Sequence, residues 1–333
     1  MPYLRKMISV IQKPYLYAVT FSIVLLSFSC YSLLDAFILP SKLADVTTPS
    51  LESSSGSSST NSSDGSNTGS SNSSGANDSQ ASGSSEDAVI TDTSYQDENL
   101  TITISTIREE NTNVYIADVK ISSIDYLKTA LAKQSYGTNI TEKTSSIASS
   151  HQAILAINGD YYGANKSGYV LKNSVLYRSL KRGDSQYDDL AILSDGSFYT
   201  FNESEVSADD LLSKGVTQLF AFGPTLIEQG KIAVNSNSEV GQSMSSNPRT
   251  AIGIIEPLHY LFVVSDGRTS ASSGLSLYQL ASILDEYGCE TAYNLDGGGS
   301  STMYFNGKVI NQPTTNGKSI SERAVSDIVY IGY

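Results

Sequence analysis

The chain has 333 residues and a formal net charge of -13 at pH 7, and this acidic balance argues against nucleic acid as a partner. Only two cysteines and two histidines occur, which leaves little material for a disulfide framework or a zinc cluster. Hydrophobic residues make up 39% of the sequence, but one early block is apolar and a later block is almost wholly polar, so the folded part is shorter than the chain.

The N-terminal block predicts a membrane anchor. Basic residues precede an uncharged run, Tyr15 to Leu34, that approaches the roughly 20 residues needed to span a bilayer. We assign residues 1–14 to a cytoplasmic basic tail and 15–39 to a single-pass signal anchor of the cell membrane, with the rest of the chain extracellular. A cleaved signal peptide is the competing interpretation, but its apolar run is usually only roughly 7 to 15 residues long.

Residues 40–90 predict a disordered linker. From Ser50 to Glu86 the sequence is Ser, Asn, Gly and Thr with scarcely an apolar side chain. Such a segment cannot bury enough apolar surface to offset the loss of chain entropy on folding. An anchor followed by a flexible tether suggests a bacterial, Gram-positive-like envelope.

Residues 91–333 predict a single α+β domain of mostly antiparallel or mixed sheet with a few helices. Alternating runs at Leu100–Ile107 and Val114–Ile121 form a hairpin, and the apolar run Ala153–Asn158 forms a buried strand. Further strands are expected over 169–177, 190–193, 197–202, 219–222, 225–234, 251–255, 260–264, 292–295, 303–310 and 326–333, and helices over 141–150, 208–214 and 277–287. Ser276 and Gly288 are the expected caps of the last helix. The polar segment 235–247 is expected to be a mobile loop or lid.

Charged residues gather at the ends of the predicted apolar strands. The set comprises Asp160, Arg249, Asp266, Arg268 and Asp296, and the C-terminal segment SERAVSD adds Glu322, Arg323 and Asp327. Each one alone is a common turn former or solvated charge. Together, arginines that bind phosphate oxygens bidentately and carboxylates that act at an anomeric carbon favour a site for a sugar joined to phosphate.

The segment Asn294 to Met303, NLDGGGSSTM, carries three consecutive glycines whose amides an anionic ligand can approach closely. A tight turn is the simpler interpretation. Nucleotide binding is disfavoured because no Gly-Lys-Ser/Thr sequence ends the loop. A serine nucleophile is also disfavoured, since the loop is not G-x-S-x-G.

Several motifs between Ala153 and Tyr333 resemble the phosphodiester glycosidase family, which includes the enzyme that uncovers mannose 6-phosphate by removing N-acetylglucosamine. The motifs are INGDYY, NPRTAIG, SDGR followed by GLSLYQLASIL, GCETAYNLDGGGSSTM and SERAVSDIVYIGY. INGDYY is the loosest match, because such proteins often have Phe where Tyr161 and Tyr162 stand. The resemblance implies hydrolysis of an α-linked sugar phosphodiester to free sugar and a phosphomonoester, and bacterial relatives are often described as exopolysaccharide-related.

The resemblance also implies a set of site residues. The candidate catalytic residues are Asp160, Asp266, Asp296 and Glu322. The candidate phosphate- and substrate-binding residues are Asn158, Gly159, Arg249, Thr250, Gly267, Arg268, Gly297, Gly298, Gly299, Ser300, Ser301 and Arg323. In our hypothesis the arginines and glycine-loop amides hold the phosphate, while one of three aspartates, Asp160, Asp266 or Asp296, acts as nucleophile or as base for water.

Two functions follow from these residues. The first is a cell-surface phosphodiester glycosidase acting on a surface glycan or wall polymer with sugar-1-phosphate links, such as wall teichoic or capsular polymer. The second is a non-catalytic surface module that binds anionic polysaccharide through the same residues. No cofactor is implied. The question of a metal stays open, since acidic loops are present but no D-x-D-x-D-G calcium spacing occurs. The expected partners are the glycan and, through the N-terminal helix, the membrane.

Overall fold

The computed structural model describes residues 14–37, 39–42, 88–183, 188–238 and 245–333. Most of the predicted linker, almost all of the predicted cytoplasmic tail and part of the predicted loop at 235–247 lie outside these residues. The helices are α2 (Pro14–Phe37), α3 (Thr144–Ser150), α4 (Ala208–Ser213) and α5 (Leu277–Glu286). Short 3-10 helices are η1 (Ile124–Tyr126), η2 (Ala132–Gln134), η3 (Tyr162–Ala164) and η4 (Gly298–Ser300).

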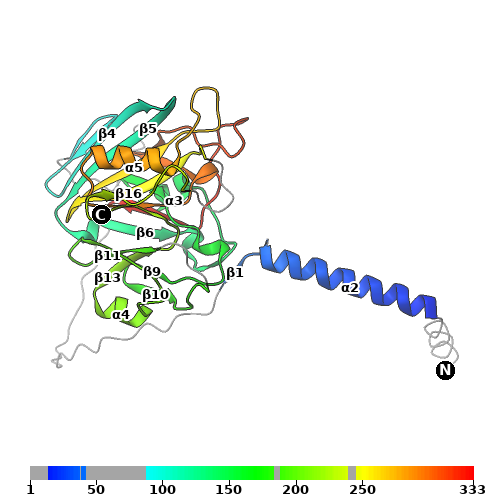
Figure 1. Ribbon diagram of the computed structural model, residues 1–333. Coiled ribbons are helices and arrows are strands. Elements are labelled where there is room, and N and C mark those ends of the chain that lie inside the picture. Colours follow the sequence, from blue (N-terminus) through cyan, green and yellow to red (C-terminus); the bar gives the residue numbers. More distant parts are fainter. Residues whose placement is uncertain (1–13, 38, 43–87, 184–187, 239–244) are drawn as a thin grey trace, which may run out of the picture.

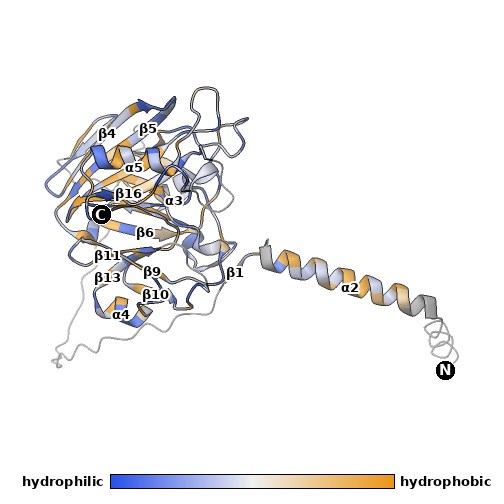
Figure 2. Ribbon diagram, viewed as in Figure 1, coloured by the Kyte–Doolittle hydropathy of each residue, from blue (hydrophilic) through white to orange (hydrophobic). Residues whose placement is uncertain are grey.

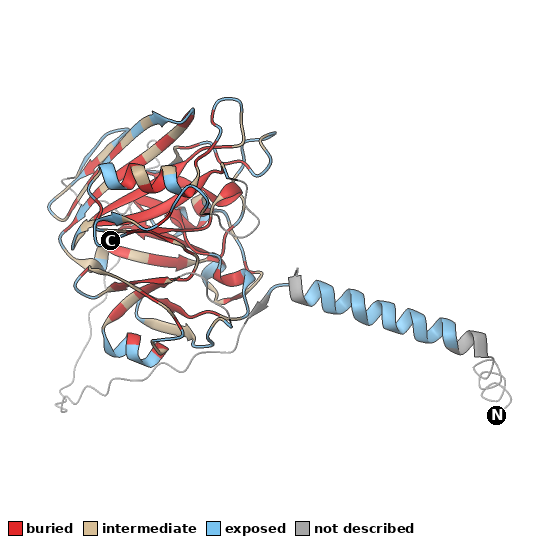
Figure 3. Cartoon of the chain, viewed as in Figure 1, coloured by how far each residue is buried: buried red, intermediate tan, exposed pale blue. Residues whose placement is uncertain are grey.

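Helix α2 projects away from the β-rich part of the chain in Figure 1. Its window Ala18–Asp35 is long and apolar enough to cross a membrane, and its described side chains are exposed (Figure 3). Figure 2 shows hydrophobic residues along its length. Exposed apolar side chains around a whole helix indicate a lipid environment, so α2 fits the predicted anchor.

The larger sheet has nine strands in the order β15 (Lys231–Ile232), β14 (Thr225–Glu228), β18 (Thr291–Asn294), β16 (Arg249–Glu256), β17 (His259–Ser265), β5 (Thr112–Ile121), β4 (Leu100–Glu109), β3 (Ser94–Gln96) and β2 (Val89–Ile90). The second sheet has five strands in the order β20 (Lys308–Val309), β19 (Met303–Phe305), β8 (Leu155–Asn158), β21 (Asp327–Ile331) and β6 (Leu127–Leu131). All pairings between strands of the described residues are antiparallel.

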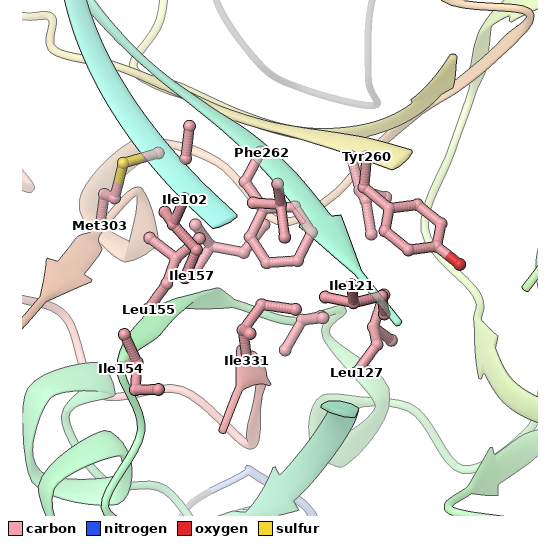
Figure 4. Packing of buried hydrophobic residues seen from close by; sticks show 14 of the residues in the cluster. Ile102, Ile121, Leu127, Ile154, Leu155, Ile157, Tyr260, Phe262, Met303 and Ile331 are labelled. Atoms are coloured by element: carbon pink, nitrogen blue, oxygen red, sulfur yellow. The ribbon is translucent and has the colours of Figure 1, made fainter. Parts of the chain in front are cut away.

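The two sheets pack face to face around the main core. Figure 4 shows Ile102 and Phe262 of the larger sheet beside Leu155, Ile157 and Ile331 of the smaller one. Each of these five side chains is fully buried. Alternation along each strand sends one set of apolar residues into this core and the next set to the outer face.

Helices cover the outer faces and give four layers. Leu280 and Leu284 of α5 pack on the larger sheet, and Ile147 of α3 packs on the smaller one. Helix α5 begins with a capping box: the Ser276 hydroxyl accepts from the Gln279 amide, and the Gln279 side chain accepts from the Ser276 amide. The predicted N-cap is therefore confirmed.

A small third sheet extends the sandwich. It has the order β12 (Phe198–Phe201), β11 (Asp189–Leu193) and β13 (Val216–Phe220), and beside it lies the hairpin β9 (Val170–Lys172) and β10 (Val175–Arg178). A further short pair joins β1 (Ser41–Lys42), just after α2, to β7 (Gly137–Thr138). The predicted α+β class, with mostly antiparallel sheet and few helices after an apolar N-terminal helix, is confirmed.

The pairing pattern collects particular strand ends at one edge of the sandwich. The start of β16 lies beside the end of β17, since Arg249 pairs with Ser265, and beside the end of β18, since Ala251 pairs with Asn294. In the second sheet the end of β8 lies beside the start of β21, where Asn158 pairs with Ile328. The polar residues predicted at strand ends therefore come from both sheets to neighbouring positions.

A buried ion cluster lies at this edge. Lys172 Nζ is 2.8 Å from Asp327 Oδ2 and 3.3 Å from Asp160 Oδ2, and it donates to the Leu219 carbonyl at 2.9 Å. The three charged side chains are at most 1% exposed. Burial raises the pKa of Asp327 to about 7, against the opposing effect of the Lys172 cation. Protonation of Asp327 leaves the Lys172 cation balanced by one carboxylate, and this neutral form is the least costly buried state of the cluster.

We predict that Asp327→Asn changes how stability depends on pH. Burial moves the pKa of Asp327 from 3.8 to about 7, so the folded state binds more protons than the unfolded state within this window. This group's contribution to stability is complete below the unfolded pKa and is lost as pH rises to the folded pKa. Urea unfolding at several pH values should show a shallower loss of unfolding free energy in the variant than in wild type. Parallel curves would contradict the assignment.

Candidate active site

A pocket of about 210 Å³ opens where these strand ends meet. Its lining residues are Phe222, Asn247, Arg249, Arg268, Asn294, Leu295, Asp296, Gly297, Gly298 and Arg323. Three are arginines, and Asp296 is the one carboxylate among them. The pocket is therefore electropositive, which suits an anionic ligand.

Asp296 and Arg323 form the charged pair of the pocket. Arg323 Nη2 donates to both carboxylate oxygens of Asp296, at 3.0 and 2.9 Å, and to the Gly297 carbonyl at 3.0 Å. Its Nε donates to Ser300 Oγ at 2.9 Å. Burial raises the pKa of Asp296, while the Arg323 cation and the hydrogen bonds oppose that rise. The side chain is a poorly hydrated carboxylate held in a fixed orientation.

Arg268 faces the pocket without a carboxylate partner in the described part of the chain. Its Nη1 donates to the Thr315 carbonyl at 2.6 Å, and its Nη2 donates to Asn247 Oδ1 at 2.8 Å. Desolvation lowers the pKa of Arg268, and repulsion from Arg323 lowers it further. Two guanidiniums held close enough to repel each other are stabilised by an anion that contacts both.

Arg249 forms another wall and is almost fully buried. It is 3% exposed, and its Nε donates to the Leu275 carbonyl at 2.9 Å. Its amide donates to Ser265 Oγ at 2.9 Å, which ties the start of β16 to the end of β17. The guanidinium is thus held on rigid strands rather than on a loose loop.

Gly298 of the glycine loop leaves room for the guanidinium of Arg268. Gly298 has a φ of +62°, and a Cβ there would lie 3.0 Å from Arg268 Nη2. A side chain at this position would be strained and would crowd the guanidinium. The Gly298 amide donates to the Pro248 carbonyl at 2.8 Å. The Gly298 amide is therefore engaged within the protein and is not available to a ligand.

Asn158 lies behind the pocket and joins its parts. Its Nδ2 donates to the Asp296 carbonyl at 2.6 Å, and its Oδ1 accepts from Thr250 Oγ1 at 2.8 Å and from the Thr302 amide at 3.2 Å. Asn158 and Thr250 are fully buried. Both residues therefore position the loop that carries Asp296. Of the other predicted binding residues, Gly159, Gly267, Gly299, Ser300 and Ser301 do not line this pocket.

The other three carboxylates predicted as catalytic do not line this pocket. Asp160 lies in the buried ion cluster with Lys172. Asp266 accepts from the Gln312 amide at 2.7 Å and from Tyr115 at 3.2 Å, which holds a neighbouring loop. Burial raises the pKa of Asp266. Burial, together with the neighbouring Asp266 carboxylate, raises the pKa of Tyr115 to about 12.

Glu322 contacts the start of α3. Its carboxylate accepts from the Ser145 amide at 2.9 Å and from the Ser145 hydroxyl at 2.5 Å. An acidic group that accepts from the first turn of a helix satisfies an otherwise free amide and favours the helix dipole. This geometry gives Glu322 a role in holding α3 against the segment that carries Arg323.

Several pocket residues were missed by sequence reasoning. Asn247 orients Arg268, and its only signal is its place before Pro248 and Arg249. Asn294 opens the glycine-loop motif, and its Nδ2 donates to the Gly223 carbonyl at 2.7 Å. Phe222 precedes the Gly223–Pro224 peptide and gives the pocket an apolar wall. Asn247 and Asn294 stand inside the motifs NPRTAIG and GCETAYNLDGGGSSTM, whereas Phe222 belongs to none of the motifs.

Comparisons with known proteins agree with this fold and motif set. A family model described as phosphodiester glycosidase matches residues 151–332. A prophage-derived protein of Bacillus subtilis, YomE, is 32% identical over 218 residues, which cover 64% of this chain and 33% of YomE. Human N-acetylglucosamine-1-phosphodiester alpha-N-acetylglucosaminidase is 30% identical over 173 residues, 48% of this chain and 33% of the human protein. The chain thus spans about a third of the length of these curated relatives.

A solved structure shares the fold. The zebrafish N-acetylglucosamine-1-phosphodiester alpha-N-acetylglucosaminidase catalytic domain, auto-inhibited by its pro-peptide, matches with a TM-score of 0.56 and 22% identity. The match covers 70% of this chain and 83% of the zebrafish chain. Since the family model covers more than half of the 333 residues, the sequence and the fold lead to one assignment: this chain belongs to the phosphodiester glycosidase family.

Proposed function

We propose that the protein is a membrane-anchored glycosidase that hydrolyses an α-linked sugar-1-phosphodiester in a surface glycan or wall polymer. The observation that carries the proposal is a single pocket in which three arginines surround one buried carboxylate, Asp296. A phosphodiester joined to a sugar needs both parts: cations for the phosphoryl oxygens and an acidic group near the anomeric carbon.

Arg249 and Arg268 bind the phosphate in this proposal. Arg323 is committed to Asp296 through two hydrogen bonds, yet its charge still adds to the potential at the phosphate. As the bond between the anomeric carbon and the phosphate oxygen breaks, its electron pair goes to that oxygen, and negative charge grows beside the guanidiniums. Fixed cations in a partly desolvated pocket stabilise that charge without reorganising.

Asp296 acts at the anomeric carbon. In the simpler form of the reaction it takes a proton from a water molecule, whose oxygen bonds to the anomeric carbon as the phosphomonoester leaves. In the alternative form, Asp296 bonds to that carbon itself, and water later displaces it. Phosphate is a good leaving group, so neither form needs a second carboxylate as acid in the pocket. The anomer of the released sugar distinguishes the forms, because inversion indicates direct attack by water and retention indicates a covalent intermediate.

Helix α2 anchors the protein in the cell membrane as a single-pass segment, with the glycosidase domain extracellular. Basic residues precede the helix, and an excess of Lys and Arg marks the cytoplasmic side of a membrane segment. This orientation presents the pocket to surface glycans.

The first prediction concerns Asp296→Asn in the full chain. The amide retains the shape of the carboxylate but can neither accept a proton from water nor attack a carbon, so turnover should fall by at least about 100-fold. Sugar release from a UDP-sugar and from a sugar-1-phosphate methyl diester measures this. Asp209→Asn makes the same chemical change on the exposed face of α4 and should leave turnover intact. Full activity in Asp296→Asn would end the assignment, and absence of turnover in wild type would favour the non-catalytic binding module.

The second prediction concerns Arg268→Met. Losing a charged hydrogen-bond donor to the phosphate costs about 1.5 to 3 kcal/mol, so KM should rise roughly 10- to 100-fold. Arg268→Lys should lie between wild type and Arg268→Met, because the charge remains and the fork geometry is lost. Lys318→Met removes a positive charge from an exposed loop position and serves as the control. An unchanged KM in Arg268→Met would exclude this arginine from phosphate binding.

The third prediction concerns the anchor. The full chain should stay with membranes after alkaline extraction. Replacing Leu25 and Leu26 with arginine, inside the apolar window, costs about 2.5 to 3.5 kcal/mol per residue at a helix centre and should release the protein. Leu39 lies outside that window, so Leu39→Arg should leave the protein in the membrane. Release of wild type by alkali would contradict a membrane-spanning α2.

A further inference from the structure

Lys172 forms a connection between strands that the proposed reaction does not use directly. Its ammonium comes from β9, Asp160 follows β8, and Asp327 begins β21. The ammonium also lies 4.1 Å from the centroid of the Phe220 ring. Four strands thus meet at one buried cation. A buried ion cluster is weak evidence for stability, because desolvation offsets much of the attraction, and its best-attested use is to fix one geometry.

Residues of the ion cluster contact the turn Asn158–Asp160 on two sides. The Gly159 amide donates to the Asp327 carbonyl at 2.9 Å, and a Cβ on Gly159 would lie 2.4 Å from Asp327 Oδ1. The Asp160 carboxylate accepts from the Tyr162 amide at 3.1 Å and from the Ala221 amide at 2.9 Å. These contacts restrict movement of the turn as long as Lys172 pairs with Asp160 and Asp327.

The Asn158–Asp160 turn makes hydrogen bonds to the backbone of Asp296. The Asp296 amide donates to the Gly159 carbonyl at 3.3 Å, and the Asp296 carbonyl accepts from Asn158 Nδ2 at 2.6 Å. The amide and the carbonyl of Asp296 are therefore both hydrogen-bonded by two consecutive residues of the Asn158–Asp160 turn. Small displacements of a reacting group lower rates steeply, so this backbone support bears directly on the reaction.

We propose that Lys172 and Asp327, together with Asp160, are positioning residues that fix the Asn158–Asp160 turn and thereby the catalytic carboxylate of Asp296. The inference rests on the proposed function of Asp296. It gives the INGDYY motif a supporting role in place of a catalytic one.

The charged and titratable groups that face this cluster come from several elements. Besides the two carboxylates beside Lys172, they are Tyr162 in η3, Asp189 in β11 and Asp296. All of the neighbouring acids disfavour ionisation of a second carboxylate. The cluster is therefore neutral while one carboxyl is protonated, and it becomes negative when both ionise.

A second cluster, with two buried acids and an arginine that is 20% exposed, supplies a control. Arg182 contacts Asp189 and lies 3.7 Å from Glu203, and both acids are at most 1% exposed. The carboxylate of Glu203 accepts from the Tyr169 amide at 2.7 Å and the Arg182 amide at 2.6 Å. None of these hydrogen bonds and ion pairs is made to residues 158–160. Removing this cation tests what the loss of a buried charge does in general.

The experiment compares Lys172→Met with Arg182→Met in the full chain. Hydrogen exchange followed by mass spectrometry should show amides of 294–303 exchanging at least about 10-fold faster in Lys172→Met, because the turn beneath Asp296 loosens. Arg182→Met should leave that segment unchanged. In Lys172→Met, kcat should fall at least about 10-fold while the Kd for inorganic phosphate stays within about threefold of wild type. A general packing defect would weaken phosphate binding as well.

Asp327→Asn tests the same proposal if Lys172→Met does not fold. Wild-type kcat should decline as pH rises through about 7, where Asp327 ionises, and this decline should be absent in Asp327→Asn. A merely structural role would leave the pH profile unmoved. Unchanged exchange at 294–303 in Lys172→Met, or a pH decline that survives in Asp327→Asn, overturns the proposal. Lack of turnover in wild type overturns the proposed function alone, since hydrogen exchange at 294–303 still tests whether Lys172 fixes the position of Asp296.

Discussion

The side chain of Asn158 is the interaction on which the candidate site depends. It leaves the end of β8 in the smaller sheet and contacts the Asp296 carbonyl, the Thr250 hydroxyl and the Thr302 amide. An amide is suited to this position, because it offers donors on one side and an acceptor on the other. An apolar side chain here would leave buried polar groups from both sheets without partners, at a cost of about 1 to 3 kcal/mol each. The two sheets are thus joined by polar contacts at the edge where chemistry is proposed, and by apolar packing elsewhere.

The pocket is organised around an excess of positive charge. Asp296 neutralises Arg323, and the guanidinium of Arg268 is oriented by neutral oxygens, Thr315 O and Asn247 Oδ1. Neutral partners hold a guanidinium in place without cancelling its charge. Carboxylate partners would have given a more stable apo site with less attraction for an anion. Neutral partners for Arg268 thus favour binding of an anion over stability of the empty pocket.

Much of the fold could be predicted from local sequence patterns. The hairpin of β4 and β5, the capped helix α5 and the strand β8 follow from alternation, helical spacing and cap residues. The gathering of Arg249, Arg268 and Asp296 was predicted from their places at strand ends. The sequence did not predict which of the strand-end acids lies in the pocket with the arginines, because that depends on how the two sheets stack. Lys172 was missed for the same reason, since a lysine at the end of a short hairpin strand reads as a surface residue until Asp160 and Asp327 are seen to enclose it.

The short pairing of β1 with β7 has a topological consequence. Only three residues separate the end of α2 from Ser41, a span of at most about 10 to 14 Å, and Ser41 already pairs with Thr138 on the folded domain. Residues 43–87 consequently begin and end on the same body. If α2 spans the membrane as proposed, a change in the length of this segment would leave the distance between the helix and the folded domain unchanged, because the pairing of β1 with β7 sets that distance. The few residues between α2 and β1, and not the long polar segment, therefore limit how far the pocket can lie from the helix.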